Sequence, residues 1–181
     1  MKQMTKRGFT LIELMVAVGI LAILASTGTA IFMRSLRGTS QIEIRRTLDD
    51  RAGLITNGLG RFFREGVVVS LGGQTRDTCL TAGSLNGSSL VVKAIDGLSS
   101  TFSVDASGLI SSVSAQTIVI NPESVTVDYQ GVLGYYFTWY CSAGIPDRLV
   151  MQFKATLVSQ QGDTSVNNDY IIDVTMRNSG Q

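Results

Sequence analysis

The residue types that support catalysis are scarce in this 181-residue chain. Histidine is absent, so the commonest general base and the commonest transition-metal ligand are both missing, and a Ser-His-Asp triad is excluded. The two cysteines, Cys79 and Cys141, lack the spacing of a zinc site, and no phosphate-binding glycine loop is present. We therefore expect no catalytic residue, no cofactor, no bound metal and no enzymatic activity.

Glu13 is the one residue whose position in the sequence indicates a functional role. It is a lone carboxylate inside an apolar run that reads Phe9-Thr10-Leu11-Ile12-Glu13-Leu14-Met15-Val16. An unpaired charge near the membrane interior costs roughly 3 kcal/mol on insertion scales, and less near the end of a span. Such a residue normally has a partner, although an incidental charge at a membrane edge is the simpler alternative.

The element that must position Glu13 is the N-terminal segment. Lys2, Lys6 and Arg7 form a cationic head that stays on the cytoplasmic side. Residues 14–33 carry no charge, and as a helix they span about 30 Å, the hydrocarbon thickness of a bilayer. The sequence predicts one membrane helix with its N-terminus inside. Small residues at 25–30 leave conventional signal cleavage, and a secreted soluble binding protein, as the alternative.

The junction GFTLIELMVAVGILAIL resembles the N-terminal signature of type IV prepilins and pseudopilins. The resemblance implies cleavage between Gly8 and Phe9 by a prepilin peptidase, which also methylates the new Phe9 amine. It further implies that Glu13 meets the Phe9 amine of a neighbouring subunit when the filament assembles. Cleavage at Gly8 removes the cationic head but keeps the apolar helix, so the product stays in the membrane.

Pilins often carry a proline late in the membrane segment, and this chain departs from that pattern. No proline precedes Pro122, although Gly28 with its flanking hydroxyl residues could loosen the helix. By resemblance, the absence favours a minor pilin or minor pseudopilin.

Residues 34–66 continue in a helical pattern. Apolar residues recur at spacings near three, four and seven, and this stripe should face a sheet: Ile44, Leu48, Ile55, Leu59, Phe62 and Phe63. Opposite charges lie four apart on the more polar surfaces, where such pairs add a few tenths of a kcal/mol and the charges are expected to be solvated: Arg45–Asp49, Arg46–Asp50 and Arg61–Glu65. Glycines mark candidate breaks: Gly38, Gly53, Gly58 and Gly60.

From Val67 onward the pattern becomes that of β-strands. Alternation predicts strands at 149–157 and 170–176, and weaker ones at 67–71, 90–95, 101–104, 117–120, 125–129 and 135–140. Residues 75–89 should form a long loop, and residues 162–169 a polar turn instead of a calcium site. The fold class expected is α+β and pilin-like, with a long N-terminal helix on an antiparallel sheet.

Cys79 and Cys141 follow the membrane helix and would lie outside the cytoplasm, where a disulfide is permitted. Two buried free thiols are the alternative. A crosslink over this separation would stabilise the domain by roughly 4 kcal/mol.

The predicted organisation is a leader at 1–8, a transmembrane and assembly helix at 9–33, an amphipathic helix at 34–66 and an extracytoplasmic head at 67–181. The expected product is a subunit of a type IV pilus or related filament, most simply a minor pilin, with a minor pseudopilin of a type II secretion system as the alternative. It would cross the inner membrane once and then join a periplasmic or extracellular filament. Expected partners are other pilin or pseudopilin subunits, the prepilin peptidase/methyltransferase, an inner-membrane assembly platform and lipid. The net charge of +1 does not indicate DNA.

Overall fold

The computed structural model describes residues 10–122, 124–129, 134–158 and 165–177, with only the backbone at 36, 37 and 40. Its contacts divide the chain into two units, Met1–Glu43 and Ile44–Gln181, which we call the N-terminal unit and the head. The first helix, α1 (Leu11–Glu65), begins in the N-terminal unit and ends in the head. The expected α+β architecture, a long N-terminal helix followed by antiparallel sheets, is confirmed.

No break interrupts α1, so the expectation that glycines divide it is wrong. At Gly38, Gly53 and Gly58 an added Cβ would meet nothing within 4 Å, whereas at Gly60 it would lie 3.5 Å from Ile172. Each glycine costs roughly 1 kcal/mol relative to alanine in a helix interior. In the head this cost is offset because the opposite face of α1 is packed: Leu48, Ala52, Ile55, Leu59 and Phe63 are all buried.

The head contains two antiparallel sheets, where the sequence suggested one. The first has the order β2-β1-β4-β5-β6-β7, formed by β2 (Gln74–Thr75), β1 (Val67–Leu71), β4 (Ser89–Lys93), β5 (Ser99–Val104), β6 (Ile110–Val113) and β7 (Thr117–Val119). The second has the order β11-β10-β9-β3, formed by β11 (Ser165–Thr175), β10 (Arg148–Val158), β9 (Phe137–Tyr140) and β3 (Ser84–Gly87). β8 (Val125–Asp128) pairs with the far end of β10.

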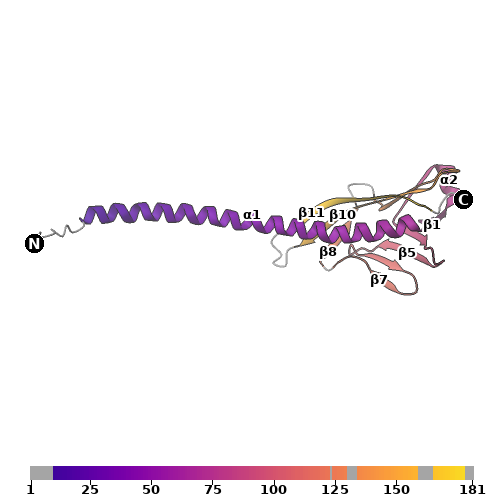
Figure 1. The fold of residues 1–181 in the computed structure, drawn as a ribbon, viewed down its shortest axis with the longest axis horizontal. Coiled ribbons are helices and arrows are strands. Elements are labelled where there is room, and N and C mark those ends of the chain that lie inside the picture. Colours follow the sequence, from indigo (N-terminus) through magenta and orange to yellow (C-terminus); the bar gives the residue numbers. More distant parts are fainter. Residues whose placement is uncertain (1–9, 123, 130–133, 159–164, 178–181) are drawn as a thin grey trace, which may run out of the picture. The chain divides into compact units, whose positions relative to one another are not determined.

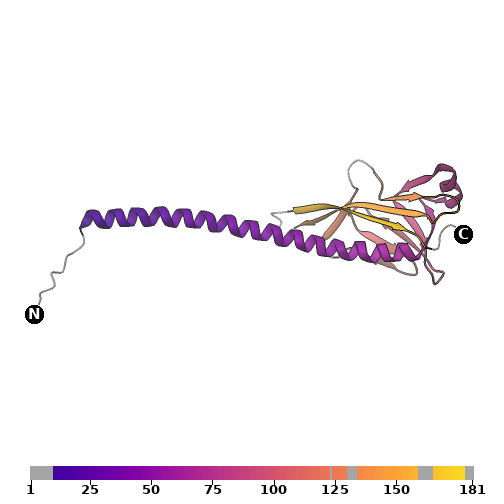
Figure 2. The same ribbon diagram turned by 45° about the horizontal axis from the view of Figure 1, so that its top comes forward.

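The strand predicted at 67–71 has the bounds of β1, and the other predicted strands are present with shifted ends, but two predicted irregular segments are wrong. Residues 75–89 hold the helix α2 (Arg76–Ala82) and β3 instead of a long loop, because β3 completes the ladder beside β9. Residues 165–169 belong to β11, which pairs with β10 along its whole length, while 162–164 lie outside the described residues. The long β10–β11 hairpin runs from orange to yellow in Figure 2.

The core lies where both sheets meet the last part of α1. The Phe63 ring makes edge contacts with Phe102 of β5 at 5.2 Å and with Phe137 of β9 at 6.3 Å between centroids. Figure 1 shows this part of α1 running alongside the strands of the head. The predicted apolar stripe is therefore confirmed, with Ile44 and Phe62 half-buried at its margins.

Candidate functional site

The first described residues show how Glu13 is held at the start of α1. The Glu13 carboxylate accepts hydrogen bonds from the backbone N–H and the hydroxyl of Thr10, each at 3.4 Å. Thr10 precedes the helix, so Glu13 occupies its third position, where a carboxylate reaches back to the N-cap amide. The spacing Thr10-x-x-Glu13 is a capping-box sequence, so this contact is readable from the sequence.

This cap gives Glu13 a local partner in the single chain. Negative charge is also favourable here because the first backbone N–H groups of a helix point toward it. At 3.4 Å both hydrogen bonds are long, so the carboxylate is held weakly and remains exposed. The cap therefore orients the Glu13 carboxylate but leaves it able to accept further hydrogen bonds from a cation.

The apolar span of the N-terminal unit is exposed along its length. Residues Leu11–Ser35 form one helical span long and apolar enough to cross a membrane. None of this span is buried within the chain: Leu11 is 76% exposed and Phe32 is 61% exposed. At roughly 25 cal/mol per Å², so much apolar surface in water is costly, and this segment therefore requires lipid or other protein around it.

The hydroxyl residues of the span do not break the helix. Ser26 and Thr27 donate to the carbonyl of Ile23, at 2.9 and 3.1 Å, and Thr29 donates to that of Ala25 at 2.8 Å. Each hydroxyl is thus satisfied inside its own helix, which allows it to sit in an apolar environment. α1 is continuous through Gly28, so the suggested loosening is not seen in the single chain.

The structure brings together only some of the residues singled out from the sequence. Gly8 and Phe9, the predicted cleavage site, lie outside the described residues. Cys79 of α2 and Cys141, which follows β9, form the expected disulfide, with their Cα atoms 5.7 Å apart. Both are buried, so this bond is a structural link and has no exposed thiol chemistry.

An ion pair that the sequence did not reveal lies beside the disulfide. Arg76, at the start of α2, donates to both carboxylate oxygens of Asp147, at distances of 3.1 to 3.4 Å. The Asp147 side chain is fully buried, and its hydrogen bond raises the pKa of Arg76. Two links therefore hold α2 to the second sheet, and Arg76 and Asp147 are too far apart in sequence for a pattern to predict their contact.

Among the described residues, one of the three predicted helix ion pairs is present. Arg61 and Glu65 lie 3.6 Å apart on the surface. Asp49 instead accepts hydrogen bonds from the hydroxyl of Tyr170 and the amide of Asn168, both on β11. Arg45–Asp49 and Arg46–Asp50 are not among the ion pairs of the described residues, and all four residues are exposed, as expected for solvated charges.

Comparison with known families finds one match, and it lies in the N-terminal unit. Residues 3–29 match the family model for the prokaryotic N-terminal methylation motif. The chain carries a prepilin-type methylation motif. Together with the apolar helix, this motif supports membership of the type IV pilin family, whose members are structural subunits. The match lies outside the head, and no curated protein and no solved structure matches the chain.

The motif also gives the segment's coarse role. It supports a subunit of the type IV pilin or pseudopilin class, which is processed by a prepilin peptidase and assembles with other pilins. An apolar N-terminal helix fits membrane anchoring. The exposed apolar surface and the prepilin-type motif thus coincide in one segment.

Proposed function

We propose that this chain is a structural subunit of a type IV pilus or related filament and that its N-terminal helix is the assembly element. The observation that carries the proposal is an uncovered apolar helix with a single carboxylate at its start, inside a prepilin-type methylation motif. The precursor is held in the inner membrane with its N-terminus in the cytoplasm and its head outside. Cleavage between Gly8 and Phe9 releases residues 1–8, and Phe9 is then N-methylated.

In the filament, residues 9–33 pack against the same segment of other subunits, while residues 34–66 continue as an amphipathic helix into the β-rich extracytoplasmic part at 67–181. Glu13 pairs with the Phe9 amine of a neighbour. In an apolar bundle the two charges neutralise each other, and removing one strands the other. The pair therefore fixes the register of neighbouring helices more than it adds to net stability.

The chain fits a minor pilin better than a bulk subunit, because no proline interrupts its membrane segment. A minor pseudopilin of a type II secretion system would be processed and assembled in the same way. The required partners are other pilin subunits, the prepilin peptidase/methyltransferase and an inner-membrane assembly platform.

Glu13 variants test this proposal. Glu13→Gln keeps an oxygen acceptor for the Thr10 amide but has no charge, whereas Glu13→Ala loses both. We expect both variants to reach the membrane and to fold normally, and both to be depleted at least tenfold from sheared filaments. The comparison measures membrane level, cleavage at Gly8 and filament content at equal expression.

Normal incorporation of both variants would contradict the proposed pairing. Normal incorporation of Glu13→Gln alone would show that Glu13 acts through the cap at Thr10 and not through its charge. The first result would leave apolar packing as the determinant of register.

A further inference from the structure

The last strand of the first sheet, β7, presents an open edge. β7 pairs with β6 on one side, and no strand of the described residues pairs with its other side. Ile118 is 62% exposed, Val119 is 51% exposed, and Thr117 is exposed as well. Figure 1 shows β7 at the margin of the head. Both the backbone and the apolar side chains of this edge are therefore accessible.

The ladder with β6 determines which backbone groups of β7 face outward. Two hydrogen bonds at the ends of this ladder define its pattern: the Ile120 amide to the Ile110 carbonyl at 2.8 Å, and the Ser114 amide to the Gln116 carbonyl at 3.2 Å. Hydrogen-bonded pairs alternate with non-hydrogen-bonded pairs in an antiparallel ladder, so Ile118 is the hydrogen-bonded residue between these ends. The N–H and C=O groups of Thr117 and Val119 therefore point away from β6, toward the open edge.

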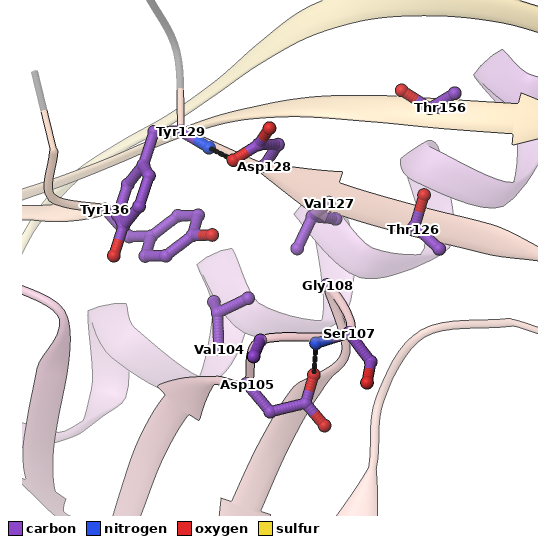
Figure 3. Close-up of a pocket in the computed structure, with 11 residues that line it drawn as sticks. Val104, Asp105, Ser107, Gly108, Thr126, Val127, Asp128, Tyr129, Tyr136 and Thr156 are labelled. Atoms are coloured by element: carbon purple, nitrogen blue, oxygen red, sulfur yellow. Dashed lines mark hydrogen bonds between the residues drawn. The ribbon is translucent and has the colours of Figure 1, made fainter. Parts of the chain in front are cut away.

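The base of the β6–β7 hairpin is fixed to the rest of the head. Asn121, which follows β7, donates to the Gly108 carbonyl at 2.9 Å and accepts from the Ile110 amide at 2.8 Å. The Val127 amide of β8 donates to the same Gly108 carbonyl at 2.8 Å, and Figure 3 shows Gly108 beside Val127. β7 is therefore a preformed strand, so a second strand can add to it with little loss of conformational freedom.

β7 lacks the features that usually protect an edge strand from pairing. Natural edge strands often carry charges or proline, which discourage the addition of another strand. β11, at the edge of the second sheet, carries Asp169 and Asp173. By contrast, residues 106–122 carry no charge, and Pro122 lies beyond β7. The chemistry of this edge therefore suits a strand that is itself uncharged and apolar.

We propose that β7 pairs in antiparallel orientation with β7 of a second copy of this chain, so that the first sheets of the two heads become continuous. The strand is complementary to itself about Ile118. Thr117 of each copy then lies opposite Val119 of the other, and the outward N–H and C=O groups of each such pair bond to one another in both directions. The pairing brings no charge to the interface, because β7 has none.

The position of Ile118 favours a second copy as the partner. Ile118 lies in one row across the sheet with Leu90, Phe102 and Ser112. Leu90 and Phe102 are buried, so this row faces the core, but Ile118 lies beyond the part that the core covers. In the proposed pair the two Ile118 residues are opposite each other, with Cα atoms about 4.5 Å apart, and each side chain covers the other.

The contact is short, so a high local concentration of the chain must support it. Anchoring in a membrane through the apolar helix supplies that concentration, and this step rests on the proposed function. The complementarity of the two strands rests on the head alone.

Cysteine crosslinking of the full chain in membranes tests the pairing. The two native cysteines are joined to each other, so an added cysteine is the only free thiol. Ile118→Cys should form disulfide-linked dimers on mild oxidation, because the two copies of this residue are direct neighbours. Val119→Cys should give at least tenfold less dimer, since its neighbour is Thr117. Ile95→Cys is the control for random collisions, because Ile95 is 74% exposed in the β4–β5 turn, and should also give at least tenfold less.

A proline variant tests the role of the outward backbone groups. When it is added to Ile118→Cys, Val119→Pro removes an outward N–H but no hydrogen bond to β6, and we expect at least a tenfold loss of dimer. Val119→Ala is the matched control: it keeps the N–H and should lower the dimer yield less than threefold. Retained Trp139 fluorescence in each variant would show that a loss of dimer is not a loss of fold.

Three results would overturn the inference: equal dimer yields from the three cysteine variants, an unchanged yield with Val119→Pro, or no dimer of Ile118→Cys in membranes that contain the chain. A crosslink from Ile118→Cys to a different protein alone would also overturn it and would assign the edge to a strand of another partner. Absence of the chain from membranes would instead count against the proposed function, and the same crosslinking in phospholipid vesicles reconstituted with the purified chain would then decide the pairing.

Discussion

The two ends of α1 are the same kind of structure and have opposite surroundings. Leu24 in the N-terminal unit is 61% exposed, whereas Leu48 in the head is 1% exposed. In the first stretch apolar residues occur all round the helix, and in the second they follow one stripe that is covered by two sheets. The first surface must be covered by lipid or by other proteins, whereas the second is covered by the sheets of the same chain.

The two parts of α1 are therefore expected to have different roles: the first serves assembly of subunits, and the second serves folding of the head. Substitutions in the N-terminal unit should change how subunits meet, while substitutions in the head should change its free energy of unfolding. Trp139 is the only tryptophan and is fully buried in the head, so its fluorescence reports unfolding of the head alone.

Removing the disulfide should have the largest effect on the head. The double variant Cys79→Ala/Cys141→Ala frees a loop whose ends are 62 residues apart, and we expect a loss of about 4 kcal/mol in the free energy of unfolding. Urea unfolding followed by Trp139 fluorescence measures it, and reduction of the wild type is the control. A loss below about 1 kcal/mol would mean that Arg76–Asp147 and the core hold α2 without the crosslink.

Truncating one leucine at each end of α1 tests the comparison directly. Leu48→Ala should cost about 3 kcal/mol, because a fully buried side chain leaves a cavity. Leu24→Ala is the matched control and should leave the unfolding curve of Trp139 unchanged. Equal losses for the two variants would show that the N-terminal unit is coupled to the folding of the head.

The smallest effect should come from the surface ion pair between β10 and β11. Arg148 donates to both carboxylate oxygens of Asp173, and this hydrogen bonding lowers the pKa of Asp173. A lowered carboxyl pKa stabilises the fold above the unfolded value of about 4, and the contribution is lost as pH falls through the folded value. Arg148→Gln should therefore be slightly less stable than wild type at pH 7.

The difference in the free energy of unfolding between Arg148→Gln and wild type should shrink at pH 3, because Asp173 is then increasingly protonated. Unfolding by urea at both pH values provides the measurement, with Arg61→Gln as the control for an exposed helix pair. If the free energies of unfolding of Arg148→Gln and wild type differ by the same amount at both pH values, the effect comes from packing of the arginine stem and not from the ion pair.

The sequence predicted those parts of the fold that local periodicity determines. The apolar stripe of α1 and the strands at 67–71 and 149–157 were recognisable because burial imposes a helical or a two-residue repeat. β3 and α2 were missed because a partner far along the chain, β9 or Cys141, gives them their structure. The second sheet was missed for the same reason, since alternation identifies a strand but not its neighbours.

The site was predictable to the same degree. Glu13 stands out by composition, and its cap on Thr10 is readable from the Thr-x-x-Glu spacing. The contact of Arg76 with Asp147 depends on tertiary packing. Such contacts leave no periodic trace in a sequence.

The mature N-terminus tests the central claim most directly. Protein recovered from membranes or filaments should have the intact mass of a chain that begins at Phe9 and carries one added methyl group. Blocking cleavage with a bulky residue at Gly8 should leave the precursor in the membrane and out of filaments. A chain that begins near Ser26 or Ile31, or one recovered freely soluble outside the cytoplasm, would contradict the account and identify a secreted protein instead.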